Sequence, residues 1–194
     1  MPKGKIIIIS GPSGSGKTTL HKELLAGKKF RARLMKSISA TTRPRRSGEK
    51  NGRDYLFLTR KQFLDKIRKG YFLEWQKVFD HYYGTPGNYV ERLLKKDKNV
   101  LLCIDVKGAA VVRRACPEAV TVFIKAPSLS ILKKRLMARG SESAEDLRLR
   151  LKRARQELLE AKKYKHVIVN DDLERSLKEL ESVVCLEIDK PGSM

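Results

Sequence analysis

The sequence predicts a three-layer α/β fold in which helices cover both faces of a parallel sheet and one mixed α/β subdomain is inserted. Three observations support this prediction. Short apolar stretches alternate with segments of helical periodicity, which is typical of parallel α/β proteins. The 194 residues are enough for one well-buried domain. Residues 37–90 interrupt the alternation and hold most of the aromatic side chains, which indicates an insertion with a small core of its own.

The expected strands of the core are short apolar runs. The first, KIIIIS at residues 5–10, holds four consecutive isoleucines and leads directly into a glycine-rich turn. A helix is predicted to open at residues 17–18, immediately after this turn. Three further buried strands are expected, at residues 100–105, 119–126 and 166–171.

Two helices are predicted between the last two of these strands. One begins at Ser128, a capping residue, and ends at Gly140. The next begins with Ser143-x-x-Asp146, a capping box with aspartate at its acidic position. Its apolar side chains recur at helical spacing and form one stripe: Leu147, Leu151, Ala154 and Leu158.

The insertion is expected to contain two strands, at residues 53–59 and 71–79, with a helix between them that Thr59 and Gln62 cap. Glu74 and Trp75 are neighbours in the second strand, so their side chains point to opposite faces. Trp75 is therefore predicted to belong to the small core of the insertion.

Composition limits the function classes. Lys and Arg number 43 against 22 for Asp and Glu, and the formal net charge of +21 favours anionic partners such as nucleotides or nucleic acids. The charge is spread along the chain without a tail-like block, which argues against a dedicated RNA-binding arm. No apolar run approaches a membrane span, and no signal peptide is evident. The three cysteines form no C-x-x-C pair, so neither a disulfide framework nor a zinc site is suggested, and a cytoplasmic location is expected.

The most specific motif is Gly11-x-x-x-x-Gly16-Lys17-Thr18, which matches the P-loop pattern and lies between a predicted strand and a predicted helix. In such loops, glycines let successive backbone N–H groups turn toward a phosphate chain, and the helix N-terminus adds partial positive charge. Lys17 would reach the β- and γ-phosphates, and the hydroxyl of Thr18 would bind Mg²⁺. The nucleotide-binding loop is expected to comprise Gly11, Pro12, Ser13, Gly14, Ser15, Gly16, Lys17, Thr18 and Thr19.

Motifs beyond this loop indicate a family. They are, in order, TTRPRRSGE at residues 41–49, FLEW at 72–75, YYGTP at 82–86, VLLCID at 100–105 and VIVNDDL at 167–173. With the P-loop, this set resembles guanylate kinases over most of the chain. The resemblance implies phosphoryl transfer from MgATP to GMP, giving ADP and GDP, a step in guanine nucleotide recycling and GTP supply. It also implies a single domain, with its core at residues 1–36 and 91–194, its GMP-binding insertion at 37–90 and a helical lid at about 135–155.

The resemblance implies roles for particular side chains. Those expected to bind GMP are Ser39, Arg43, Arg46, Glu49, Tyr55, Glu74, Tyr83, Thr85 and Asp105. Those expected to act on the transferred phosphoryl group are Lys17, Arg43, Arg135, Arg139 and Arg150. Arg135 and Asn170 would also contact ATP. Mg²⁺ is the expected cofactor, bound by Thr18 with Asp105 acting through water.

The chemistry of these residue types supports the implied roles. A monophosphate dianion is well held by the permanently charged forks of arginines. Guanine presents two adjacent donors, N1–H and the N2 amino group, and the carboxylate of Glu74 could accept from both. Adenine would instead place an acceptor, its N1, against that carboxylate. The acceptor phosphate is already an anionic nucleophile, so positioning and charge neutralisation are expected to carry catalysis without a strong general base.

Some positions depart from the family pattern or leave alternatives open. Cys103 stands where the family usually has an acid, which leaves Asp105 alone near the metal. Thr85 stands where serine is common, and Arg45 could compete with Arg46 for the GMP phosphate. Three other arginines of the lid region are expected to be solvated helix charges: Arg148, Arg153 and Arg155.

Three other functions remain as alternatives: a kinase for another nucleotide or small metabolite, a binding module without catalysis, and a P-loop protein that binds nucleic acid. Glu74 with Ser39 and Thr85 favours guanine, and the intact P-loop lysine and lid arginines favour catalysis. The expected partners are therefore ATP and GMP, with dGMP as an alternative acceptor. Neither a membrane nor a specific nucleic acid is expected.

Overall fold

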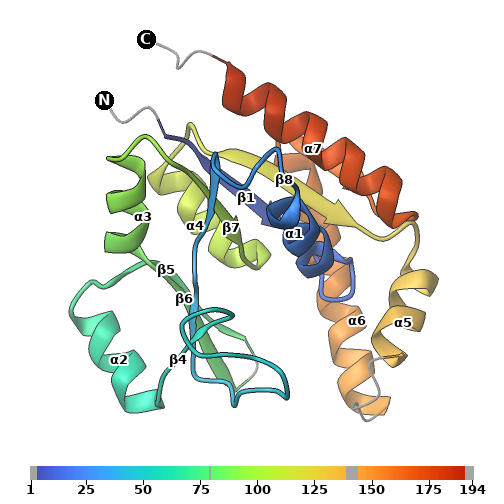
Figure 1. Cartoon of the computed structure of the whole chain (residues 1–194). Coiled ribbons are helices and arrows are strands. Elements are labelled where there is room, and N and C mark those ends of the chain that lie inside the picture. Colours follow the sequence, from blue (N-terminus) through green and yellow to red (C-terminus); the bar gives the residue numbers. More distant parts are fainter. Residues whose placement is uncertain (1–3, 79, 139–143, 191–194) are drawn as a thin grey trace.

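The computed structural model describes residues 4–78, 80–138 and 144–190, which form two sheets and the helices around them (Figure 1). One sheet has five parallel strands and helices on both faces. The other has four strands of mixed direction, all from the insertion. The predicted fold class, a parallel α/β core with an inserted mixed subdomain, is confirmed.

All neighbouring strands of the core sheet run parallel. Their spatial order is β2 (Leu34–Lys36), β7 (Asn99–Cys103), β1 (Ile6–Ser10), β8 (Val120–Lys125) and β9 (His166–Val169). β1 pairs with β7 so that Ile9 lies opposite Cys103, and the residues that follow both strands therefore meet at one edge of the sheet. Ligands of open α/β sheets bind at this carboxyl edge.

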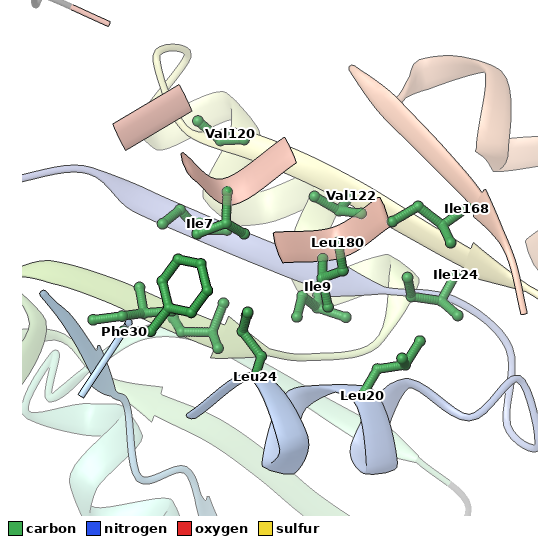
Figure 2. Packing of buried hydrophobic residues seen from close by; sticks show 13 residues of the cluster. Ile7, Ile9, Leu20, Leu24, Phe30, Val120, Val122, Ile124, Ile168 and Leu180 are labelled. Carbon is green, nitrogen blue, oxygen red and sulfur yellow. The ribbon is translucent and has the colours of Figure 1, made fainter. Parts of the chain in front are cut away.

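One face of the core sheet is covered by α1 (Lys17–Ala26) and α7 (Leu173–Asp189). Alternate isoleucines of β1 enter this layer and pack against leucines of both helices (Figure 2). The fully buried members from β1, α1 and α7 are Ile7, Ile9, Leu20, Leu24, Leu180 and Val184. This packing fixes α1, and with it the loop that precedes it, to the middle of the sheet.

The elements that cover the opposite face include α3 (Gly87–Leu94), α4 (Val106–Ala115) and the 3₁₀ helix η1 (Glu160–Lys163). Ile6 and Ile8 of β1 point into this second apolar layer. The four consecutive isoleucines thus supply both layers, which explains why β1 is apolar without alternation.

A pair of helices, α5 (Leu129–Met137) and α6 (Ala144–Leu159), packs together beside the core sheet (Figure 1). Ser128 caps α5 as predicted, because its hydroxyl accepts a hydrogen bond of 3.2 Å from a backbone N–H three residues on. The predicted helix end at Gly140 and the predicted cap at Ser143 lie outside the described residues. The predicted apolar stripe of α6 packs against α5 through Leu147, Leu151 and Ala154.

The insertion consists of β3 (Ala40–Thr41), β4 (Leu56–Phe57), α2 (Arg60–Arg68), β5 (Phe72–Val78) and β6 (His81–Pro86). The spatial order of its strands is β4, β3, β6 and β5. The predicted strand at residues 53–59 is reduced to the two residues of β4. The predicted capping box of α2 is confirmed, since Thr59 and Gln62 exchange both hydrogen bonds.

A β-bulge in β5 decides which side chains face the core of the protein. Between Phe72 and Glu74 the pairing partner in β6 advances by one residue while β5 advances by two. Phe72 therefore stacks on Phe63 of α2, with 4.5 Å between ring centroids, and Glu74 points to the other face. Trp75 shares the face of Phe72 but is 41% exposed. The prediction that Trp75 belongs to the small core was wrong.

The outer faces of the helices carry much of the positive charge, and α2 alone exposes Arg60, Lys61 and Arg68. Within the described ranges, no helix combines the length and the apolar character needed to cross a lipid bilayer.

Candidate functional site

A cleft of about 650 Å³ lies at the carboxyl edge of the core sheet and reaches the insertion and α6. Its wall contains most of the residues that the sequence singled out, namely Gly11, Ser13, Gly14, Gly16, Lys17, Thr18, Ser39, Arg43, Arg46, Glu49, Tyr55, Glu74, Tyr83, Asp105 and Arg150. Other predicted residues are described but are not part of this wall: Pro12, Ser15, Thr19, Thr85, Arg135 and Asn170. The fold thus brings the P-loop, the insertion and the lid helix to one site.

The P-loop between β1 and α1 needs glycine at both ends. Gly11 and Gly16 have φ angles of +144° and +90°. A Cβ atom on Gly11 would lie 2.1 Å from the carbonyl oxygen of Ile124, and one on Gly16 would lie 2.0 Å from Nδ2 of Asn170. Gly16 directly precedes α1, whose first N–H groups have no partners inside the helix. The loop therefore combines a turn that requires glycine with a helix N-terminus, which is a favourable site for a phosphate chain.

Two side chains hold this loop in shape without a ligand. Lys17 donates from Nζ to the carbonyl oxygen of Pro12 at 3.0 Å. Asn170, which follows β9 and is 5% exposed, donates from Nδ2 to the carbonyl oxygen of Ser15 at 2.8 Å. Asn170 thus ties the last core strand to the P-loop, and the contact with ATP that the resemblance implied for this residue stays a prediction.

Glu74 is buried, at 5% exposure, yet it contributes to the cleft wall. Thr85 lies directly opposite in β6 and donates its hydroxyl to Oε1 of Glu74 at 2.6 Å. Burial raises the pKa of Glu74 to about 7, and the charge of Asp105 acts in the same direction, while the hydrogen bond from Thr85 opposes the shift. A poorly solvated carboxylate of this kind gains strongly from a ligand that presents N–H donors.

Arg43 is oriented by Glu49. Its Nη2 lies 2.7 and 3.0 Å from the two carboxylate oxygens, and the backbone N–H of Arg46 donates to the same carboxylate at 2.8 Å. Burial works against the charge of Arg43, but the hydrogen bonds with Glu49 outweigh it and raise the pKa of the guanidinium. The guanidinium also lies over the ring of Tyr55, 5.6 Å from its centroid. Glu49 therefore holds Arg43 in position and is itself part of the cleft wall.

The phenol rings of Tyr55 and Tyr83 meet edge to face, with centroids 6.3 Å apart, on the same wall as Arg43. Burial raises the pKa of Tyr55 to about 12, so its hydroxyl is a neutral donor at physiological pH. Of the two adjacent arginines, Arg46 is part of the wall and Arg45 is not. Two arginine forks and two phenol hydroxyls gathered in this way suit a phosphate dianion.

Asp105 has a cationic partner that the sequence analysis missed. Oδ1 of Asp105 accepts from the backbone N–H of Gly108 at 2.7 Å and so caps α4, and Oδ2 lies 3.2 Å from Nη2 of Arg153 on α6. Nε of Arg153 donates to Oε1 of Glu157 at 2.7 Å. The prediction that Arg153 is a solvated charge was wrong. Asp105, which was expected to stand without a second acid because residue 103 is a cysteine, is paired with this arginine. The signal that could have found Arg153 is its position three residues after Arg150, on the same face of the helix.

The three predicted lid arginines differ in their positions. Arg150 of α6 is part of the cleft wall. Arg135 lies near the end of α5 and does not contribute to that wall. Arg139 lies outside the described residues.

The residues present fit a magnesium ion that is bound mainly through phosphates. In the part of the chain that the structure describes, no group of three or more His, Cys, Asp or Glu side chains could hold a metal by itself. Thr18 has its side chain exposed at the start of α1, and Asp105 belongs to the same cleft wall with both oxygens already engaged. Mg²⁺ usually retains several waters and takes its other ligands from substrate phosphates and one or two protein oxygens, so this sparse donor set suits it.

Comparisons with known proteins agree with this geometry. The family model described as guanylate kinase matches residues 3–187. Guanylate kinases from Caldanaerobacter subterraneus subsp. tengcongensis and Symbiobacterium thermophilum are each 43% identical to the chain. These matches cover 95% and 96% of this chain and 88% and 87% of the relatives. The crystal structure of guanylate kinase from Anaplasma phagocytophilum has a TM-score of 0.80 and 32% identity, over 98% of this chain and 89% of that one.

Proposed function

The chain belongs to the guanylate kinase family, and we propose that its cleft holds ATP and GMP at opposite ends. The enzyme transfers a phosphoryl group from ATP to GMP and forms ADP and GDP. The observation that carries the proposed arrangement is one cleft wall that contains both a complete P-loop and the buried carboxylate of Glu74.

At the donor end, the P-loop binds the phosphates of ATP. Backbone N–H groups at the start of α1 and the ammonium group of Lys17 surround the β- and γ-phosphates. The hydrogen bond between Lys17 and Pro12 is exchanged for contacts with the phosphates when ATP binds. Arg150 approaches the same phosphates from the lid helix, and we assign the same role to Arg135 and Arg139 after lid closure.

At the acceptor end, Glu74 reads the guanine base. Thr85 occupies one lone pair of Oε1 and keeps the carboxylate in place, so the remaining lone pairs can accept from guanine N1–H and the N2 amino group. Ser39 lies on the same wall and completes the base contacts. Arg43, Arg46, Tyr55 and Tyr83 bind the GMP phosphate, and Glu49 keeps Arg43 in position for it.

The transfer itself needs positioning and charge neutralisation. An oxygen of the GMP phosphate attacks the γ-phosphorus of ATP, and the bond from that phosphorus to the bridging oxygen breaks as ADP leaves. The attacking oxygen is already anionic, so no side chain has to remove a proton. Cations from both ends, Lys17 and Arg150 on one side and Arg43 on the other, stabilise the charge of the transition state.

Thr18 would hold Mg²⁺ together with the phosphates, and Asp105, which belongs to the same cleft wall, would contact the ion through water. When bound there, Mg²⁺ neutralises charge on the β- and γ-phosphate oxygens. The insertion at residues 37–90 and the lid at about 135–155 close over the two substrates and exclude water, which would otherwise hydrolyse ATP. All three cysteines are free thiols, which agrees with the cytoplasmic location that we propose.

The test is a coupled assay of ADP release with every common nucleoside monophosphate, including dGMP. We expect GMP to be the best acceptor, dGMP to be used as well, and AMP, CMP and UMP to be poor. Equal kcat/KM values for GMP and AMP would overturn the assignment of Glu74 as the guanine reader. Metal dependence is tested by adding a chelator and restoring Mg²⁺, which should abolish and then restore ADP release.

A further inference from the structure

Arg153 takes no part in the reaction steps above, yet it connects the lid helix with the acceptor end of the cleft. Two of its nitrogens contact carboxylates on different elements, Asp105 at the start of α4 and Glu157 on α6 itself. The side chains of Arg153, Asp105 and Glu157 are 26%, 23% and 14% exposed, so the three charges are partly shielded from water. An ion pair in such a place is more strongly coupled than one at a fully exposed surface.

Asp105 lies next to the guanine-reading carboxylate. A Cβ atom on Gly108 would be 2.5 Å from Oε2 of Glu74 and 3.3 Å from Oδ1 of Asp105, so the Cα of this glycine is in reach of both carboxyl groups. Each of two neighbouring carboxylates disfavours ionisation of the other, and a cation on one of them relieves the repulsion. The contact between Arg153 and Asp105 supplies such a cation.

We infer that Arg153 is a positioning residue for guanine recognition, which acts by holding Asp105 in place beside Glu74. The inference rests on the proposed binding of GMP at Glu74. Asp105 is held between two elements, with one oxygen bonded to the N-terminus of α4 and the other to α6. Without Arg153, the second oxygen loses its partner, and the carboxylate is free to rotate toward Glu74 and the base.

The charges around Asp105 also depend on the residue that ends β7. Cys103, which ends β7 two residues before Asp105, lies in the same cleft wall, and burial raises the pKa of its thiol. The cleft wall therefore has no carboxylate at the end of β7, and Arg153 of α6 adds a positive charge to it. Asp105 is consequently paired with a cation across the cleft, and this pairing sets the electrostatic environment of the base site.

The first test is the substitution Arg153→Met, which keeps the aliphatic stem and removes the charged fork. We expect the KM for GMP to rise about tenfold, while kcat and the KM for ATP stay within about twofold, because Asp105 keeps its bond to the N-terminus of α4 and loses only the contact that holds it beside Glu74. Arg153→Lys keeps the charge but cannot contact Asp105 and Glu157 through a fork, so it should show a smaller rise. Arg155→Met is the matched control, since Arg155 is exposed on the same helix, and it should leave all three constants unchanged.

A double-mutant cycle separates the positioning role from a general structural role. In the Asp105→Asn background, Arg153→Met should change the KM for GMP by less than about twofold, because the carboxylate through which Arg153 acts is absent. The inference is overturned if Arg153→Met leaves the KM for GMP unchanged, raises the KM for ATP equally, or has the same effect in both backgrounds. If Arg153→Met does not fold, as judged by circular dichroism, Arg153→Lys gives the same test in both backgrounds. Failure of the wild-type enzyme to phosphorylate GMP would instead count against the proposed function.

Discussion

The two ends of the cleft are built from different parts of the polypeptide. The donor end is mainly backbone: a loop with Gly11 and Gly16 at positive φ and the N-terminus of a helix that packs on the middle of the core sheet. The acceptor end is made of side chains from short strands and one loop of the insertion. There, each recognition group depends on one polar neighbour, Glu74 on Thr85 and Arg43 on Glu49.

This difference predicts how each end responds to substitution. Backbone N–H groups are not removed when a side chain is substituted. A side-chain substitution at the donor end should therefore reduce transition-state stabilisation while the loop still binds nucleotide. At the proposed acceptor end, we assign the choice of base to a single side chain, that of Glu74. Substitution of this side chain should abolish recognition of GMP and leave the binding of ATP at the donor end unaffected.

The largest effect is expected for Glu74→Gln. This substitution keeps the shape but turns one acceptor into a donor that opposes a guanine N–H. Sites that read a substrate through buried hydrogen bonds can reject a mismatched partner by about 10⁴-fold, so we expect a loss of that order in kcat/KM for GMP. The kinetic constants for GMP, IMP and AMP in both proteins provide the measurement.

Affinity for ATP is the control in this experiment and should not change, because the P-loop lies at the other end of the cleft. Activity on AMP should stay low or rise slightly, since a donor could now meet adenine N1. An unchanged ratio of GMP to AMP activity would show that guanine is read by other residues.

The second effect concerns the donor end. Lys17→Met removes the side-chain cation from the P-loop and leaves the backbone cradle in place. We expect kcat to fall by about 10³-fold while ATP still binds, since removal of one preorganised charged donor typically costs this much. Calorimetry measures whether the variant still binds ATP, and GDP formation in the same preparation measures the loss in kcat. Near-normal turnover would contradict the assigned role of the P-loop.

The sequence was sufficient for the features that depend on local pattern. The P-loop, the cap of α5 at Ser128 and the capping box of α2 are set by residues within a few positions of each other. The buried strands of the core could also be predicted, because four consecutive isoleucines have no solvated face. About half of the residues of the cleft wall followed from the P-loop motif and the family resemblance.

The features that were missed depend on contacts between distant segments. Arg153 faces the cleft only because Ala154, the next residue of α6, is buried against α5, which fixes the rotation of the helix. Phe72 and Glu74 face opposite sides because a bulge adds a residue to β5, and an alternating pattern cannot show this. The two-residue strand β4 exists only through its pairing with β3. Periodicity within one segment contains none of this information.

A third prediction is that the base-reading carboxylate destabilises the free enzyme. The pKa of Glu74 is about 7 in the folded protein and 4.5 in its ordinary state, so the folded state retains a proton that the unfolded state releases between these values. Stability should therefore fall as the pH rises through this window and stay low above it. Glu74→Gln avoids the loss, and we expect it to be more stable than wild type by about 3 kcal/mol at pH 8 and by much less at pH 5. Urea unfolding at both pH values measures the difference, and equal stabilities at pH 8 would contradict burial of a charged Glu74.

The same titration should appear in substrate affinity. Only the ionised carboxylate accepts from both guanine donors, so GMP affinity should rise about tenfold from pH 6 to pH 8 as Glu74 ionises. The GMP phosphate also ionises near pH 6 and contributes a smaller change of its own. Dissociation constants for Glu74→Gln over the same range isolate that contribution. If GMP affinity depends on pH equally in wild type and Glu74→Gln, the whole effect comes from ionisation of the GMP phosphate and not from Glu74.

The smallest effect is expected for Glu49→Gln, which decides whether Glu49 supports Arg43 or binds GMP directly. An amide has only one oxygen that accepts, so Arg43 keeps at most one of its two hydrogen bonds to residue 49. Its hydrogen bond to the Pro44 carbonyl and its position over Tyr55 are kept. If Glu49 only orients the arginine, the KM for GMP should rise about threefold to fivefold, with kcat and the KM for ATP unchanged. Glu174→Gln, which removes an exposed ion pair on α7, is the matched control and should have no kinetic effect. A loss of a hundredfold or more in kcat/KM would mean that Glu49 contacts the substrate itself, and the acceptor end would then depend on two carboxylates instead of one.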